Sequence, residues 1–186
     1  MPSLQAQTAA TVELKPQQLP GPFIAIAADG AITVQVNRLD FGQGVSTALP
    51  MLVAEEMDAD WTRVRGVLAP AAAAYADPVF GMQMTGGSAS MHNSWQQYRE
   101  IGARARAMLV AAAAKQWGVD AAQLTVAQGV VSAPGGRKAG FGELAAAAMA
   151  QPVPSSVTLK SPADFKLLGT PQPRKNARDI VRGRQA

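Results

Sequence analysis

Two short glycine-rich segments carry the residues of this chain that could do chemistry. The first is Phe41-Gly42-Gln43-Gly44, in which two glycines flank one glutamine. Glycine has no Cβ, so backbone N–H groups there can approach a ligand closely. The glutamine amide can both donate and accept hydrogen bonds, which suits an oxygen-rich, anionic ligand. The alternative is a tight turn without a ligand, because Gly-x-Gly alone is a weak signal.

The second segment is Thr85-Gly86-Gly87-Ser88-Ala89-Ser90, which we expect to stand at the start of the longest helix. Threonine and serine hydroxyls, together with glycine N–H groups at a helix N-terminus, can hold an anion, commonly a phosphate. The alternative is an ordinary N-cap, in which the glycines serve backbone geometry alone. Two such turns in one small chain, each opening a helix, favour a ligand site.

The elements around the first segment follow from the spacing of apolar residues. Residues 31–37 alternate between apolar and polar side chains, which predicts a strand paired through an Asp29-Gly30 hairpin turn with residues 23–27. Helical spacing then predicts a helix from residue 45 to about 58, where Asp40 could cap the turn before it. Glu55 and Glu56 are adjacent on this helix, so they point about 100° apart and we expect them to be solvated.

The rest of the chain completes a small α+β fold. We expect a third strand at 63–68, an apolar loop at 69–83, a long helix at 91–117 ended by Gly118, a hairpin at 124–132, a helix at 140–150 and a strand at 157–160. The predicted architecture is an antiparallel sheet of short strands packed with two main helices. Residues 1–21 are typical of a flexible arm, 22–170 form one domain, and 171–186 form a basic exit segment.

The composition limits the kinds of site that this chain can form. It has no cysteine and one histidine, His92, among its 186 residues. This rules out disulfides, cysteine ligands for iron–sulfur clusters or zinc, a cysteine nucleophile and a histidine metal cluster. Any metal would have to arrive inside a cofactor or be shared with another chain. A lone histidine such as His92 is more typical of a surface or capping residue.

The net charge of +4 is concentrated near the end of the chain. Five basic residues crowd the last thirteen positions: Arg174, Lys175, Arg178, Arg182 and Arg184. Such a segment can bind nucleic acid, but without interleaved aromatic residues a solvated linker is the favoured interpretation. No run is long and apolar enough to span a membrane, and residues 1–7 lack the features of a signal peptide. We therefore expect a cytoplasmic protein, or a periplasmic one if a leader has been removed.

The two glycine-rich segments, about 40 residues apart, resemble those of the large subunit of the molybdenum hydroxylases, the xanthine dehydrogenase and aldehyde oxidoreductase superfamily. The resemblance is closer to the isoquinoline 1-oxidoreductase beta-subunit type. It covers nearly everything from residue 22 onward. Beyond the two segments it includes residues 49–61, Ser94-Trp95, Arg99, 102–106, 111–118, Phe141-Gly-Glu-Leu144 and 157–169.

The resemblance implies a molybdopterin cofactor, often as the cytosine dinucleotide, whose dithiolene holds the metal without a protein cysteine. It assigns to Gln43, between Gly42 and Gly44, a hydrogen bond to an oxygen on molybdenum. It places Thr85 to Ser90 against the pterin and phosphates. The implied activity is hydroxylation of an aldehyde or N-heterocycle with oxygen from water.

This sequence departs from the family pattern in several places. No motif matches the family's catalytic glutamate, and Asn176 stands where the branch usually has aspartate. The chain corresponds to about a quarter of a large subunit, and the resemblance implies the remainder of that subunit and a 2Fe–2S small subunit as partners. We expect a cofactor-binding part that is not active alone. Alternatives are a cofactor-free assembly module and, less favoured, a nucleic-acid binder.

Overall fold

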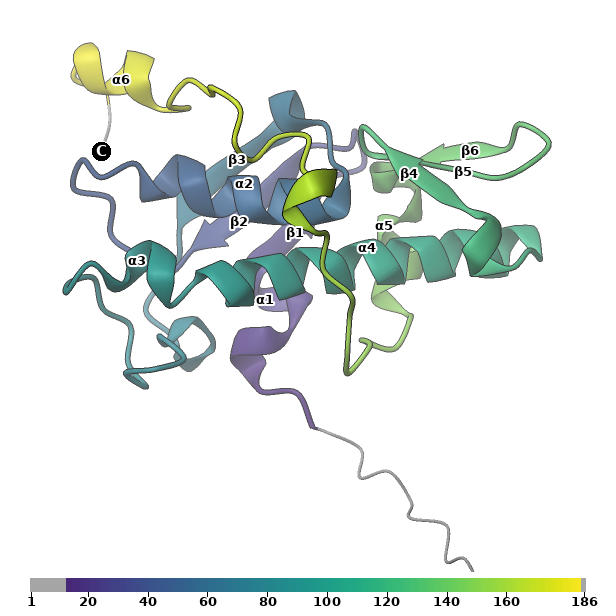
Figure 1. Cartoon of the computed structure of the whole chain (residues 1–186), viewed down its shortest axis with the longest axis horizontal. Helices are drawn as coiled ribbons and strands as arrows, with labels where there is room; N and C mark the ends of the chain where they lie inside the picture. The colour runs from purple at the N-terminus through teal and green to yellow at the C-terminus, as the bar shows by residue number, and fades with distance from the viewer. Residues whose placement is uncertain (1–12, 185–186) are drawn as a thin grey trace, which may run out of the picture.

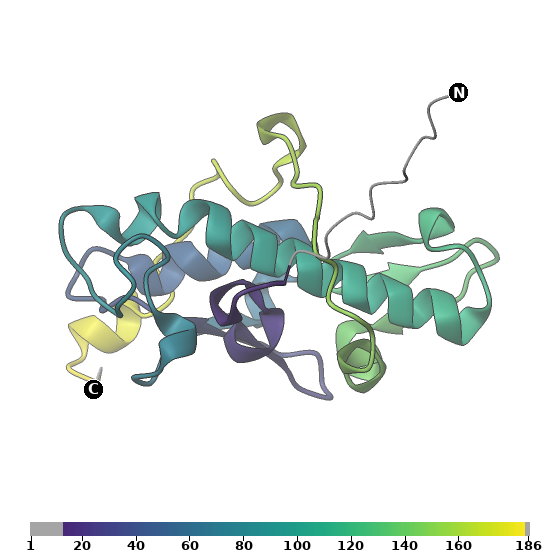
Figure 2. The same cartoon turned by 90° about the horizontal axis from the view of Figure 1, so that it is seen from below.

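The structure, a computed structural model, describes residues 13–184. In that part of the chain two long helices and two three-stranded sheets form the body of the molecule (Figure 1). The long helices are α2 (Val45–Met57) and α4 (Trp95–Trp117), and α4 runs along the length of the molecule (Figure 2). The first sheet contains β1 (Ile24–Ile26), β2 (Ile32–Val36) and β3 (Val64–Leu68), and the second contains β4 (Thr125–Ala127), β5 (Val130–Ser132) and β6 (Lys138–Gly140).

The α+β class is confirmed, but the first sheet is mixed. β1 and β2 are antiparallel around the expected turn at Asp29-Gly30, where Gly30 N donates to Ala27 O. β3 instead runs parallel to β2, with Ile32 opposite Val64 and Val36 opposite Leu68. The expectation of a wholly antiparallel sheet was therefore wrong for β3. The reason is α2, which crosses back between the two strands and lets the chain enter β3 in the same direction as β2.

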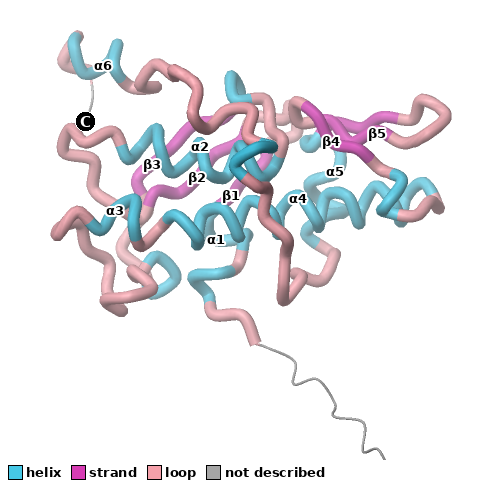
Figure 3. Tube along the Cα trace, viewed as in Figure 1, coloured by secondary structure: helices cyan, strands magenta, loops and turns pink. Residues whose placement is uncertain are grey.

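Shorter helices fill the connections between these elements. They are η1 (Pro16–Gln18), α1 (Pro20–Phe23), η2 (Trp61–Arg63), η3 (Ala73–Tyr75), α3 (Ala89–His92), η4 (Ala121–Gln123), α5 (Phe141–Met149), η5 (Pro162–Asp164) and α6 (Ala177–Val181). Residues 1–12 of the expected arm lie outside the described residues, and η1 and α1 occupy most of its remainder. Loops make up much of the end of the molecule where α3 and α6 lie (Figure 3).

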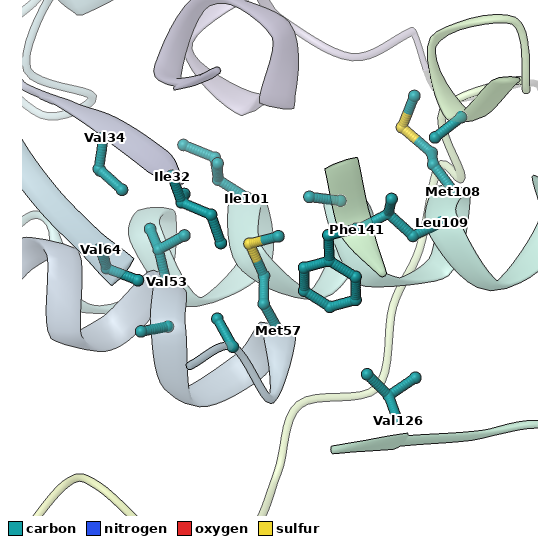
Figure 4. Close-up of a cluster of buried hydrophobic side chains, with 14 of the residues drawn as sticks. Ile32, Val34, Val53, Met57, Val64, Ile101, Met108, Leu109, Val126 and Phe141 are labelled. Atoms are coloured by element: carbon teal, nitrogen blue, oxygen red, sulfur yellow. The ribbon is translucent and has the colours of Figure 1, made fainter. Parts of the chain in front are cut away.

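The core lies between α2, α4 and the first sheet, and it continues to α5 and the second sheet. Figure 4 shows Ile32, Val53, Met57, Ile101 and Phe141 meeting there, and all are at most 2% exposed. The helices approach closely at Gly102, where an added Cβ would lie 2.8 Å from Val53 O. Glycine at this position of α4 is therefore a packing requirement.

The expected long helix is broken into α3 and α4 at Asn93 and Ser94. Both side chains at the break are held by residues from elsewhere in the chain. The Asn93 amide donates to Asp77, and Ser94 Oγ accepts from the Arg38 guanidinium at 2.9 Å and 3.1 Å. The prediction of one continuous helix was wrong because helical periodicity carries no sign of these contacts.

An extended strap of residues 150–176 crosses α4 and α2 (Figure 1). Two acidic residues of α2 hold it. Glu55 accepts from the backbone N–H groups of residues 166, 167 and 168 and from Lys160 Nζ. Glu56 accepts from Lys160 N at 3.1 Å and from Arg99 Nε at 2.7 Å. Both glutamates are 2% exposed, so the expectation that they are solvated was wrong.

The same strap shows a second difference from the sequence-based expectation. Residues 157–160 form no strand, because Lys160 N donates to the Glu56 carboxylate. The helix expected at 140–150 is present as α5. A short apolar segment becomes a strand only where another strand pairs with it. The strap lies over helices, so residues 157–160 have no strand to pair with.

Candidate functional site

The two glycine-rich segments lie together at one end of the molecule. The first follows the carboxyl end of β2 and leads into α2, and the second precedes α3. The chain just before the first segment is bonded to the second, because Leu39 N donates to Thr85 Oγ1 at 2.7 Å. Tyr98 of α4 fixes the chain just before the first segment, since its hydroxyl accepts from Asn37 N and donates to Gln35 O.

The turn from Phe41 to Gly44 has the open backbone that glycine permits. Gly42 and Gly44 have φ of 122° and 83°, and an added Cβ at either would meet nothing within 4 Å. Gly44 is also the N-cap of α2. Phe41 lies beside this open space with 71% of its surface exposed. The turn can therefore accept a group that comes into close contact with its backbone.

The Gln43 amide spans its own turn. Its Oε1 accepts from Phe41 N at 2.9 Å, and its Nε2 donates to Leu39 O at 2.6 Å. A glutamine amide has two N–H donors and two lone pairs on its oxygen. One N–H and one lone pair of Gln43 thus stay available to a ligand, and the side chain is exposed.

The N–H groups at the start of α2, which we expected to be free for an anion, are bonded to Asp40. Its carboxylate accepts from Gly42 N, Gly44 N and Ser46 N at 3.0–3.2 Å, and also from Ser46 Oγ. The expected capping role of Asp40 is confirmed. Burial acts to raise the pKa of Asp40, but these hydrogen bonds outweigh it and lower that pKa to about 2.

Two residues of the basic segment contact the same turn and the helix behind it. Arg174 Nη1 donates to Gly42 O at 2.8 Å, and its Nη2 lies 2.9 Å from Asp40 Oδ1. Lys175 Nζ lies 4.0 Å from the centre of the Trp61 ring. The sequence placed Arg174 and Lys175 in one basic segment with the arginines at 178, 182 and 184, which are exposed. The distribution of charge along a sequence does not reveal these long-range contacts.

The second segment differs from its expected setting. Its glycines precede α3, a single turn, whereas the long helix α4 begins at Trp95 with Ser94 as N-cap. Ser88 caps α3 without a side-chain hydrogen bond and has φ of 58°. Within the described residues, the backbone N–H groups of Gly86, Gly87 and Ser88 have no partner. His92 on α3 is exposed, as expected.

A buried ion pair supports this end of the molecule and was missed in the sequence. Arg38 Nη2 lies 2.5 Å from Asp77 Oδ2, with side chains 1% and 0% exposed. Arg38 Nη1 also donates to Met84 O, just before the second segment. Asp77 accepts from the N–H groups of Val79 and Phe80. The only signal was an arginine directly after a strand of buried residues, and surface arginines are common at such positions.

The site end has a cavity and an apolar rim. The cavity measures about 310 Å³ and lies between the ends of β2 and β3 and residues 83–85. Large apolar side chains that are more than half exposed surround this end: Leu39, Phe41, Leu68, Val79, Phe80 and Met82. Exposed apolar groups in this number typically mark a surface that contacts another molecule or segment.

Two further observations concern metals and membranes. Among residues 13–184, no group of three or more His, Cys, Asp or Glu side chains is placed to hold a metal ion. Within the same range, no helix combines the length and apolar character needed to cross a bilayer.

The chain is similar in sequence to large bacterial oxidoreductase subunits. It is 39% identical over 124 residues to the membrane-bound aldehyde dehydrogenase [pyrroloquinoline-quinone] of Gluconacetobacter polyoxogenes. The matched region covers 67% of this chain and 15% of that protein. It is 32% identical over 200 residues to isoquinoline 1-oxidoreductase subunit beta of Brevundimonas diminuta, covering 88% of this chain and 26% of that protein. The chain thus spans between about a seventh and a quarter of the length of these two relatives.

Two solved structures share the fold. CO dehydrogenase from Oligotropha carboxidovorans superposes with a TM-score of 0.52 at 19% identity, over 66% of this chain and 15% of that one. Quinoline 2-oxidoreductase from Pseudomonas putida 86 superposes with a TM-score of 0.51 at 15% identity, over 68% of this chain and 16% of that one. The family model of the molybdopterin cofactor-binding domain matches residues 5–179. The chain therefore belongs to the molybdopterin cofactor-binding domain family of the molybdenum hydroxylase large subunits.

Proposed function

We propose that the two adjoining glycine-rich segments bind a molybdenum–pterin cofactor as part of a molybdenum hydroxylase. The observation that carries this proposal is the Leu39 N to Thr85 Oγ1 hydrogen bond, which holds the two segments side by side. The residues present suit such a group. Within the described residues, Gly42 and Gly44 leave open space, Gln43 keeps one N–H and one lone pair, and Gly86 to Ser88 offer unpaired N–H groups.

Each residue then has a distinct task. Gln43 orients an oxygen of the bound group through its remaining N–H, and Phe41 offers an exposed ring to the flat pterin. The N–H groups of Gly86, Gly87 and Ser88 hold phosphate, which suits the cytosine dinucleotide form. When bound, the cofactor supplies two-electron redox chemistry and hydroxylation with oxygen from water. Asp40 is already paired and contributes no contact to the ligand.

The substrate class that we propose is an aldehyde or an N-heterocycle, in line with the names of the two relatives. The proposed partners are the remaining part of a large subunit and a 2Fe–2S small subunit that receives the electrons. The exposed rim of Leu39, Phe41, Leu68, Val79, Phe80 and Met82 supports a further polypeptide at this end of the molecule. We infer that this chain alone does not turn over.

The same rim favours a second candidate, a cofactor-free assembly module. Such a module would use its apolar surface to bind another subunit, and its glycine turns would have no ligand. The two candidates differ in what substitution of Gln43 does. A cofactor site should lose metal or activity after Gln43→Ala in the assembled protein, whereas an assembly module should lose neither.

The test is elemental analysis of the chain purified from its native host with the polypeptides that accompany it. We expect about one molybdenum per chain, with iron contributed by a second subunit. A solvent extract should also be analysed for pyrroloquinoline quinone, because the name of one relative includes that cofactor. An assembled complex that contains the quinone and no molybdenum, or neither group, would refute the proposal.

A further inference from the structure

Arg174 links the end of the strap to the first glycine-rich turn. It is 132 residues beyond Gly42, whose carbonyl accepts from Arg174 Nη1 at 2.8 Å. Its Nη2 donates to Asp40 Oδ1 at 2.9 Å, and its Nε donates to Asn176 Oδ1 at 2.7 Å. All three guanidinium nitrogens thus donate, one of them to a carbonyl of the turn and one to the Asp40 carboxylate that caps it. A planar guanidinium with a fixed fork of donors is suited to such multiple contacts.

The strap places Arg174 with little freedom. Lys175 N donates to Thr47 Oγ1 of α2, and Lys175 Nζ lies over the Trp61 ring. Asn176 Nδ2 donates to Ser46 Oγ, which itself donates to Asp40. Arg174 is therefore followed directly by two residues that are each bonded to the start of α2. Its side chain is 26% exposed and that of Asp40 is 2% exposed, so solvent weakens this ion pair only in part.

The turn depends on hydrogen bonds for its shape, because glycine leaves its backbone free to adopt many conformations. Gly42 and Gly44 both have positive φ, and a Cβ added at either would meet nothing within 4 Å. The hydrogen bonds that define the turn come from Asp40, Gln43 and Arg174. Only Arg174 is distant in sequence, and it holds both a carbonyl and the carboxylate.

We propose that Arg174 is a positioning residue that holds the turn from Phe41 to Gly44 in the shape described here. The effect on cofactor retention rests on the proposed function, whereas the effect on the turn does not. Arg174 acts through Asp40 and Gly42 O and itself contacts no ligand. Loss of Arg174 therefore loosens residues 40–46 and leaves the body of the fold intact.

The test is amide hydrogen exchange, followed by mass spectrometry, on the full chain with its accompanying polypeptides. Arg174→Gln should raise exchange of the Gly42, Gly44 and Ser46 amides about tenfold, the size expected for one charged hydrogen bond. Arg174→Lys keeps the charge and loses the fork, so we expect a partial rescue. Arg182→Gln is the matched control, because Arg182 is an exposed arginine with no side-chain partner among residues 13–184.

Three comparisons separate positioning from a general loss of stability. Exchange in α4 should not change in Arg174→Gln. In an Asp40→Asn background, Arg174→Gln should add less than it does alone, because the two residues act on each other. Molybdenum retention should fall in Arg174→Gln and not in Arg182→Gln.

The proposal is overturned if exchange at residues 40–46 is unchanged in Arg174→Gln, or if α4 loosens equally. If a loosened turn retains molybdenum as well as the parent does, the role of Arg174 in holding the turn stands, and the proposed cofactor contact at this turn fails. If the parent itself contains no molybdenum, the proposed function fails, and the exchange result still decides the role of Arg174.

Discussion

Arg38 and Asp77 form an ion pair at 2.5 Å in which both side chains are at most 1% exposed. The pair connects Arg38, two residues beyond the end of β2, with the loop that leads to the second glycine-rich segment. Ser94 and Asn93, at the break between α3 and α4, complete its hydrogen bonds. One interaction therefore fixes three connections at the site end of the molecule.

Removal of one partner of this pair should strongly destabilise the chain. Arg38→Met leaves the Asp77 carboxylate buried without its cation, and breaking a buried pair in this way costs about 3–5 kcal/mol. The measurement is the free energy of unfolding in urea. Arg63→Gln is the control, because Arg63 lies 3.7 Å from Asp29 with side chains 45% and 71% exposed. That change should cost less than about 1 kcal/mol, and equal losses in both variants would contradict the prediction.

Acid should weaken the chain as its paired carboxylates become protonated. Hydrogen bonds lower the pKa of Asp40 to about 2 against the opposing effect of burial, and the pKa values of Glu55, Asp58 and Asp77 are also lowered. A carboxyl group with a depressed folded-state pKa contributes stability above its unfolded pKa and loses it as the pH falls. The free energy of unfolding should thus fall between about pH 4 and 2. Asp40→Asn should have a shallower fall, and an identical pH profile would show that Asp40 contributes nothing.

The contact between α2 and α4 should not tolerate a side chain at position 102. Gly102→Ala places a Cβ 2.8 Å from Val53 O and 3.0 Å from Val53 Cα, so the helices must separate. We expect a loss of about 1–3 kcal/mol in unfolding free energy, as for other overpacked cores. Gly21→Ala is the control, because its Cβ would meet only Met149 Cε at 4.0 Å. A Gly102→Ala variant as stable as Gly21→Ala would mean that the helices pack less tightly than described.

Two glycines with the same backbone strain should differ in their effect on cofactor retention. Gly44 and Gly135 have φ of 83° and 84°, and neither would place a Cβ within 4 Å of another group. Alanine at either position should cost about 1–2 kcal/mol of stability from the left-handed backbone. Only Gly44→Ala should lower the molybdenum content of the assembled protein, because its Cβ enters the open space beside Gln43. Equal molybdenum in both variants would argue against a ligand at this turn.

Local patterns predicted the elements better than they predicted the contacts between them. The alternation in residues 31–37, the Asp29-Gly30 turn and the helical spacing after residue 45 each correspond to an element that formed. The direction of β3 depended on the α2 crossover, and the break at Asn93 and Ser94 depended on residues far away in the chain. Neither has a periodic signature.

The polar contacts around the site explain most of what the sequence could not reveal. Asp40 was recognisable as a cap because the N–H groups that it caps lie within six residues of it. Arg174 and Asp77 act across long sequence separations, so their charges resembled those of ordinary surface residues. Glu55 and Glu56 were expected to be solvated for the same reason, since their partners lie on the strap.

The strap has a consequence for the order in which the chain can fold during its synthesis. Glu55 leaves the ribosome 105 residues before Lys160, one of its partners. At about 5–20 residues per second, that interval lasts roughly 5–20 s. Throughout this time the Glu55 carboxylate must remain hydrated, whereas Glu56 can already pair with Arg99 of α4. The nascent domain therefore completes its packing late, when the strap arrives.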